Sequence, residues 1–221
     1  MKDNEREFML VSVWDWQTRV LHWTNAILIM TLALLALSAE GMEWPGVERE
    51  VRRQIKEIHA YMGYILVFTL TVRIIWGFIG NEYARWIDII PHKKERWQAI
   101  WGNIKWYLRG FKGSLPLSIG HNPLASLFYI ALFIVLLGQV LTGLALAGVE
   151  FGMFPGSLLT VGFDEELIEE VAEDVHEFGL WFILFFIVAH LTGLVVHEIG
   201  EKAGLLSSMI HGRKYIPKER L

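Results

Sequence analysis

The chain has 221 residues, a mean hydropathy of +0.38 and 53% hydrophobic residues, including ten tryptophans. This apolar share lies above the roughly 45–50% that is usual for soluble domains, and it is typical of a polytopic membrane protein. There is no cysteine, which excludes thiolate-held iron–sulfur clusters, covalently attached c-type haem and disulfides within the chain.

Four apolar segments are predicted to cross a membrane, at about residues 19–39, 59–80, 122–148 and 176–198. A transmembrane helix needs about 20 apolar residues. We therefore predict an all-α fold in which residues 1–221 form a single domain, a transmembrane four-helix bundle. The first segment ends ALLALSAE, only weakly like a signal-peptide cleavage site. We expect it to be retained as a span because it carries His22 at its start.

The basic residues predict the orientation. Fifteen Lys and Arg lie before or at the start of the first segment, in the second loop and in the C-terminal tail, against four in the first loop and none in the third. The positive-inside rule then puts both termini on the cytoplasmic side of the membrane. The acidic third loop, from Asp164 to Asp174, is expected to face outward.

The last apolar segment, within DVHEFGLWFILFFIVAHLTGLVVHE, carries His176 and His190. Their spacing of fourteen residues is close to four helical turns, so both rings lie on one side, about 21 Å apart along the axis. Each is followed three residues later by a glycine, Gly179 or Gly193, which leaves a gap where a flat group could lie. Ionisable side chains inside a membrane helix are costly and indicate a functional site.

A second pair of histidines matches the first in depth. His59 begins the second segment from outside, like His176, and Gly63 follows it by one turn. His22 lies near the inner end of the first segment, at the level of His190. Neutral imidazoles on facing helices are suitable axial ligands for b-type haem. The pattern therefore predicts two haems at two depths.

Basic residues near the inner end could pair with haem propionates: Arg19, Arg73, Arg213 and Lys214. Arg19 could instead reach lipid headgroups. His197 is a rival to His190 as a ligand, because it lies seven residues further along the same face. We prefer His190, since His197 is expected at the inner interface, facing water or lipid.

The third segment begins GHNPLASLF, with Pro123 suited to the first helical turn. His121 and Asn122 would lie at the depth of the inner haem, where they could hydrogen-bond a quinone. The alternative is that Asn122 only caps the helix and that His121 is an interfacial or capping residue.

The second loop predicts an amphipathic helix. Four apolar residues form a stripe among basic neighbours: Trp97, Trp101, Ile104 and Leu108. Such a helix lies in the membrane interface or packs on a partner protein. The basic tail SSMIHGRKYIPKER is expected to lie against the membrane surface.

These motifs resemble a known family. The stretches WDWQTRVLHW, IHAYMGYILVFTLTVRIIWGFIGNEYAR, GHNPLASLFYIALFIVLLGQVLTG and VHEFGLWFILFFIVAHLTG, with MIHGRK, resemble the bacterial four-helix dihaem cytochrome b family. Its members include the b-type cytochrome subunits of nickel–iron hydrogenases and relatives that serve formate dehydrogenase or thiosulfate reductase. The resemblance runs from about Val13 to Lys214 and keeps the order of the motifs.

The resemblance implies that His22, His59, His176 and His190 bind two b haems. It also implies that the chain passes electrons between a periplasmic redox subunit and the membrane quinone. Hydrogenase members often carry a further histidine just before the one matching His176, where this chain has Val175. Another dehydrogenase or a c-type cytochrome is therefore an alternative partner to a hydrogenase-like subunit.

Other functions would also use histidines in membrane spans. A free-standing cytochrome b could oxidise quinol for a soluble c-type cytochrome, and histidines could line a metal transporter or belong to a structural anchor. The predicted spans lack the deep Asp and Glu that a hydrated cation path would need. No nucleophile–base set is visible, so we expect an electron-transfer subunit in the lipid bilayer rather than an independent catalyst, with no nucleic-acid partner.

Overall fold

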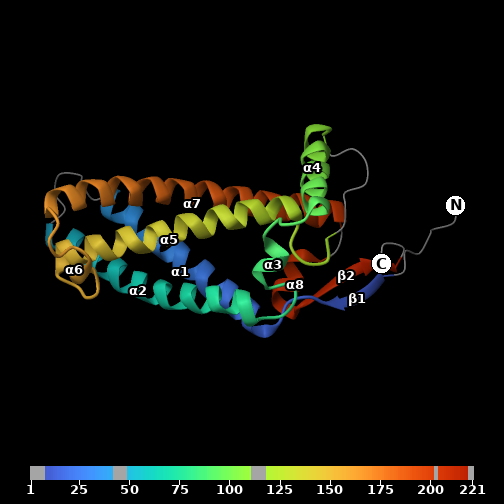
Figure 1. The fold of residues 1–221 in the computed structure, drawn as a ribbon, viewed down its shortest axis with the longest axis horizontal. Coiled ribbons are helices and arrows are strands. Elements are labelled where there is room, and N and C mark those ends of the chain that lie inside the picture. The colour runs from blue at the N-terminus through green and yellow to red at the C-terminus, as the bar shows by residue number, and fades with distance from the viewer. Residues whose placement is uncertain (1–7, 42–48, 111–117, 202–203, 219–221) are drawn as a thin grey trace. The chain divides into compact units, whose positions relative to one another are not determined.

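The computed structural model describes residues 8–41, 49–110, 118–201 and 204–218. Four long helices dominate these residues (Figure 1): α1 (Trp16–Gly41), α2 (Arg49–Ile79), α5 (Pro123–Phe151) and α7 (Glu165–Glu201). Each contains a stretch long and apolar enough to cross a membrane. The predicted all-α membrane fold is thus confirmed. Five basic residues used in the orientation argument lie outside the described residues: Lys2, Arg6, Lys112, Lys202 and Arg220.

Two of the long helices begin before the predicted spans. Helix α2 starts at Arg49 and α7 at Glu165, about ten residues before the apolar segments. In α7, Oδ1 of Asp164 accepts hydrogen bonds from the backbone N–H groups of Glu166 (3.0 Å) and Leu167 (3.3 Å), which caps the helix. Carboxylates in a first turn are stabilised by the helix dipole. The acidic segment predicted as a loop is therefore mostly the start of α7.

Large apolar side chains cover the outside of the long helices. Several are more than half exposed in the isolated chain: Phe68, Phe78, Ile134, Phe178, Phe185 and Val188. In water such a surface would be a strong driving force for aggregation. In a bilayer it is the surface that faces the lipid tails, while the backbone groups are satisfied inside each helix. The chain is a multi-pass membrane protein.

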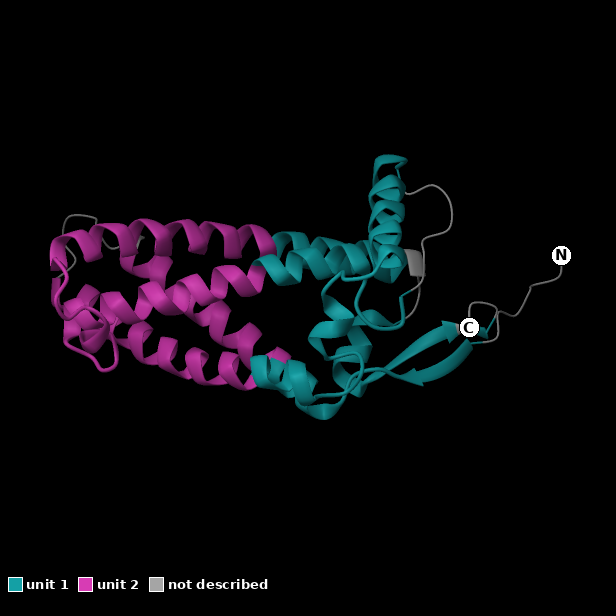
Figure 2. Cartoon of the chain, viewed as in Figure 1, with its two compact units in different colours: residues 1–21, 73–131, 187–221 teal, residues 22–72, 132–186 magenta. Residues whose placement is uncertain are grey.

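The chain divides into two compact units, which are coloured separately in Figure 2. One unit, here called the histidine unit, comprises residues 22–72 and 132–186. It contains segments of the four long helices and the short α6 (Gly156–Leu159). Helix α6 packs directly on α5, because a Cβ on Gly156 would lie 1.8 Å from the carbonyl oxygen of Leu144. Helices α1 and α2 are linked where the Thr69 hydroxyl donates to Oδ1 of Asn25 at 2.6 Å.

The other unit, here called the ladder unit, comprises residues 1–21, 73–131 and 187–221. Besides the remaining ends of the long helices it holds five short elements: β1 (Phe8–Ser12), α3 (Trp86–Ile89), α4 (Lys94–Leu108), α8 (Leu205–His211) and β2 (Arg213–Pro217). Strands β1 and β2 pair antiparallel, with Ser12 opposite Arg213 and Phe8 opposite Pro217. The tail predicted to lie on the membrane surface thus forms α8 and a strand paired near the other end of the chain.

Helix α4 confirms the amphipathic helix predicted in the second loop. Its buried residues are Ile100, Asn103 and Trp106. The predicted apolar stripe lies largely on the other side, where Trp101 is 60% and Leu108 is 81% exposed. Within the ladder unit this stripe is therefore available to a lipid interface or to a partner.

Candidate functional site

His59 of α2 and His176 of α7 face each other inside the histidine unit. Their ring centroids are 6.1 Å apart and their planes are inclined by 70°. A metal-bound imidazole nitrogen lies about 2.05 Å from the metal and about 1.1 Å from its own ring centroid, so two opposed ligands have centroids about 6.3 Å apart. The observed separation matches two axial ligands on one metal ion.

Both histidines line a cavity of about 530 Å³ to which all four long helices contribute. This volume lies within the range of roughly 300–1,000 Å³ found for ligand and cofactor sites. Most of the wall is aliphatic, including Leu32, Leu66, Leu136, Leu180 and Ile183. An apolar wall of this kind keeps water from a bound group.

Glycines keep the space beside the two imidazoles open. No atom lies within 4 Å of the position where Gly63 would carry a Cβ, and Gly63 lines the cavity as predicted. Gly143 of α5 also lines it, and a Cβ there would lie 3.1 Å from Cε1 of His176. Sequence reasoning missed Gly143, although its position in an apolar span beside Thr142 was a usable signal.

The tautomer of His176 follows from its neighbour on α5. The Thr142 hydroxyl donates to the carbonyl oxygen of Gly138 at 2.9 Å, and its oxygen lies 2.8 Å from Nδ1 of His176. Because the hydroxyl hydrogen is used, Nδ1 is the donor in this contact and Nε2 keeps its lone pair. A hydrogen bond of this kind orients a metal-binding imidazole.

Gly179 has a different role from the one predicted. A Cβ at Gly179 would lie 2.1 Å from Nε2 of Gln139. That amide donates to the carbonyl oxygen of His176 at 2.8 Å. The space beside Gly179 is therefore filled by Gln139, which joins α5 to α7 at the level of the histidine. The sequence offered no charge or motif that would have identified Gln139.

The other predicted pair is described in separate units. His22 lies in the histidine unit, half-buried, with its ring edge-on to Trp23 at 5.2 Å. His190 lies in the ladder unit and is exposed on α7. Gly193 has open space where a side chain would begin. The joint role of His22 and His190 stays a prediction.

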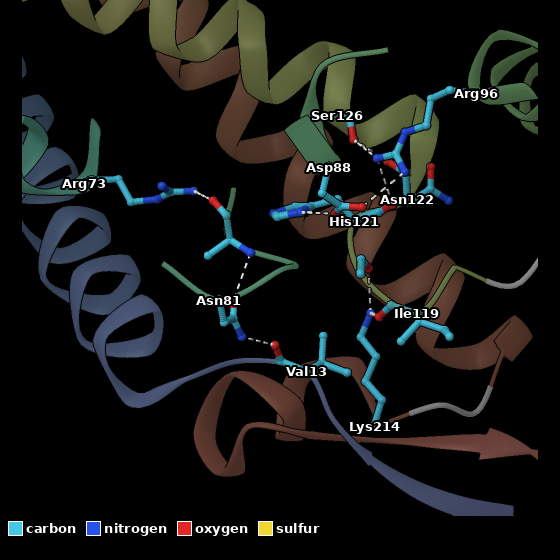
Figure 3. A network of polar contacts seen from close by, with 12 residues as sticks. Val13, Arg73, Asn81, Asp88, Arg96, Ile119, His121, Asn122, Ser126 and Lys214 are labelled. Carbon is cyan, nitrogen blue, oxygen red and sulfur yellow. Dashed lines mark hydrogen bonds and ion pairs between the residues drawn. The ribbon is translucent and has the colours of Figure 1, made fainter. Parts of the chain in front are cut away.

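The ladder unit holds all four basic residues predicted to meet propionates: Arg19, Arg73, Arg213 and Lys214. Arg73 is 5% exposed, with its guanidinium 5.3 Å from the Trp86 ring centroid and 5.6 Å from that of Tyr129. It also donates to the carbonyl oxygen of Ala84 at 3.3 Å (Figure 3). Cations are attracted to aromatic faces in this way. Arg73 thus has protein partners on several sides.

Arg19 and Lys214 bind backbone carbonyls. Arg19 donates from Nε to the carbonyl oxygen of Asp15 at 3.3 Å and from Nη1 to that of Ile210. Lys214 donates from Nζ to the carbonyl oxygens of Ile119 (2.8 Å) and Gly120 (2.9 Å) (Figure 3). Both cations connect the C-terminal segment to other parts of the ladder unit.

Asn122 caps α5, which was one of the two roles that the sequence allowed for this residue. Its Oδ1 accepts from the N–H groups of Leu124 (2.9 Å) and Ala125 (3.2 Å). Its Nδ2 donates to Oδ1 of Asn103 at 3.0 Å, and Asn103 is fully buried in α4. Both ends of the Asn122 amide are therefore engaged.

His121 lies beside a carboxylate. Its Nδ1 is 3.5 Å from Oδ2 of Asp88 (Figure 3). Its ring packs 4.9 Å from that of Trp14. Burial lowers the pKa of His121, against the opposing effect of Asp88. The positive charges of Arg73 and Lys214 lower this pKa further.

His197 differs from the prediction that it meets water or lipid. It is buried, its Nε2 lies 2.8 Å from the Tyr107 hydroxyl, and its ring packs 6.0 Å from that of Trp106. The amphipathic helix α4 covers it, an arrangement that the hydropathy of α7 alone could not show.

The chain is similar to known proteins over nearly its whole length. The sequence model of a family described as prokaryotic cytochrome b561 matches residues 13–212. A protein of Azotobacter vinelandii, named probable Ni/Fe-hydrogenase B-type cytochrome subunit, is 29% identical over 231 residues, covering 99% of this chain and 94% of that protein. One of the same name from Rhizobium leguminosarum bv. viciae is 31% identical, covering 92% and 88%. A probable Ni/Fe-hydrogenase 1 B-type cytochrome subunit of Escherichia coli K12 is 28% identical, covering 90% and 88%.

Proposed function

Because the chain belongs to the prokaryotic cytochrome b561 family, we propose that it is the membrane subunit through which a nickel–iron hydrogenase exchanges electrons with quinone. It is a membrane electron-transfer protein of the b-type cytochromes, which carry haem b. The finer proposal is that it holds two haems, one between His59 and His176 and one between His22 and His190. The names of its relatives support a hydrogenase as the partner.

The observation that carries the proposal is the pair His59 and His176 across the cavity. A porphyrin supplies four ligands to its iron and needs two more from the protein, which is the number that these imidazoles offer. Among the described residues, no group of three or more His, Cys, Asp or Glu side chains is placed to hold a bare metal ion. The apolar walls and the open space at Gly63 fit a flat, bulky group.

The protein's own residues have distinct tasks in this site. A bound haem supplies one-electron chemistry. His59 and His176 would hold it, and Thr142, whose hydroxyl oxygen lies 2.8 Å from Nδ1 of His176, would orient that ring. Gln139 fixes the backbone at His176. The leucine-rich wall excludes water, and a dry site limits the reorganisation that accompanies a change of charge.

We propose that electrons pass between this chain and the hydrogenase on the periplasmic side, where His59 and His176 would hold the outer haem. They would pass between the chain and quinone near the cytoplasmic side of the inner membrane, where His22 and His190 would hold the inner haem. The basic residues, concentrated in the termini and second loop, support this orientation. Because Asn122 is engaged as a cap, His121 with its neighbour Asp88 is the better candidate to exchange protons with the quinone.

The test is the haem content of four single variants purified in detergent. The pyridine haemochrome assay should give two haems for the unmodified chain. It should give one haem for each of the His59→Ala, His176→Ala, His22→Ala and His190→Ala variants. His197→Ala is the matched control and should keep both haems. A loss of haem in the His197 variant, with His190→Ala unaffected, would reassign the inner ligand.

A further inference from the structure

The charged side chains of the cavity in the histidine unit gather at one end. Five charged side chains line it: Arg52, Lys56, Glu150, Glu173 and Glu177. Arg52 and Lys56 precede His59 in α2, Glu173 precedes His176 in α7, Glu177 follows it directly, and Glu150 lies near the end of α5. Past the histidines the lining is uncharged, with Leu66, Leu136 and Ile183. A haem has the same asymmetry, since its two propionates extend from one edge of an apolar macrocycle.

The two basic residues lie on the same face of α2 as His59. Lys56 precedes His59 by three residues and Arg52 by seven, which are the spacings of neighbours along one helix face. At 1.5 Å per residue they lie about 4.5 Å and 10.5 Å from His59 along the axis. Both line the cavity that the His59 ring also lines, at its charged end.

Lys56 already binds a carboxylate at this charged end of the cavity. Its Nζ lies 3.3 Å from Oε2 of Glu150, and the two side chains are 41% and 37% exposed. A pair this exposed contributes little to stability and can rearrange. Glu150 can turn to water if another carboxylate takes its place on Lys56.

We propose that Arg52 and Lys56 bind the two propionates of the haem held by His59 and His176, which fixes the porphyrin with its propionate edge toward the N-terminal end of α2. This rests on the proposed function, because it requires a haem at that site. The two cations then offset the charge of the two propionates, beside the three glutamates that line the same end. Three of the four partners predicted from sequence bind other groups in the ladder unit: Arg19, Arg73 and Lys214. A guanidinium suits this task because it binds a carboxylate through two parallel hydrogen bonds.

The experiment uses the full-length haem-loaded protein in detergent and compares Arg52→Gln, Lys56→Gln, Arg53→Gln and Glu150→Gln. Arg53 is the matched control, because it has the same charge on the same turn of α2 but is exposed and does not line the cavity. Two properties are measured: the propionate bending band in the resonance Raman spectrum and the rate of haem transfer to excess apomyoglobin.

Arg52→Gln and Lys56→Gln should each shift the propionate band and speed the loss of one haem by about two- to fivefold, the effect of removing one partly exposed ion pair. Arg53→Gln should change neither property. Glu150→Gln should not speed the loss, since it leaves Lys56 free for the propionate.

Two outcomes would overturn the inference. If Arg52→Gln and Lys56→Gln behave like Arg53→Gln while His176→Ala still removes one haem, the propionates bind elsewhere and the proposed function stands. If His59→Ala and His176→Ala both keep two haems, no haem lies at this site, and the inference falls together with the proposed function.

Discussion

Replacing Gly179 by alanine tests the link between α5 and α7 beside His176. The added Cβ would lie 2.1 Å from Nε2 of Gln139, so the amide must move. Its hydrogen bond to the His176 carbonyl is then lost, at about 1 kcal/mol. Overpacking adds about 1–3 kcal/mol, whereas alanine gains about 1 kcal/mol over glycine in a helix. The net destabilisation is therefore about 1–3 kcal/mol.

A double variant separates this mechanism from general damage. Gln139→Ala alone removes the hydrogen bond and should cost about 1 kcal/mol. In Gly179→Ala/Gln139→Ala the new methyl group has room, so the double variant should be more stable than Gly179→Ala alone. Additive effects would instead make it the least stable of the three.

The assay is thermal unfolding of the haem-loaded protein in lipid nanodiscs, followed by the Soret band. For a chain of this length a destabilisation of 2 kcal/mol lowers the midpoint by about 4–8 °C. The reasoning would be refuted if Gly179→Ala had an unchanged midpoint, or if the double variant unfolded at the temperature expected from adding the single effects.

Three further predictions concern the cavity, pH and the partner. Gly63→Ala should leave the haem-free chain at least as stable as the unmodified chain, because nothing lies within 4 Å of the new Cβ. The same change should lower the haem content measured by the pyridine haemochrome assay. Equal haem content would show that Gly63 does not face the porphyrin. Since burial lowers the pKa of His121, folding stability should be unaffected above about pH 6.5 and fall below it, by at most about 1.4 kcal/mol per pH unit. His121→Asn should remove this part of the fall in unfolding midpoint, and an unchanged pH profile would contradict the assignment. Changing Glu165, Glu166, Glu169 and Glu170 to Gln should slow electron transfer with the hydrogenase and reduce its salt dependence while both haem spectra stay intact; unchanged transfer kinetics would mean that the first turns of α7 do not dock the partner.

The main features of the fold could be predicted because they rest on strong one-dimensional signals. Long apolar segments identify membrane helices with little regard to tertiary structure. Charged residues such as Arg52 and Glu169 continue α2 and α7 beyond the apolar segments, and hydropathy does not register such polar helical turns. The pairing of β1 with β2 joins distant parts of the chain, and no local pattern predicts such a partner.

The sequence singled out the two facing histidines of the cavity but not the residues around them. His59 and His176 stood out because ionisable groups are rare in apolar spans. Thr142 and Gln139 did not, since uncharged polar residues in a membrane helix are equally consistent with helix packing. Arg52 and Lys56 were read as signals of orientation, although both line the cavity. Asn122 is the opposite case, a residue that sequence reasoning considered for a site. Its amide could have bound a quinone, but it is occupied by the helix cap and by Asn103.

The most direct test of the account is the redox titration of His176→Met against the unmodified protein. A thioether can replace the imidazole as an axial ligand and raises the potential of the haem that it binds. Both haems should remain in the His176→Met variant. One of them should have a clearly higher midpoint potential, and the potential of the other should be unchanged. Two haems with unaltered potentials in the His176→Met variant would show that His176 does not bind haem iron, and would contradict the account.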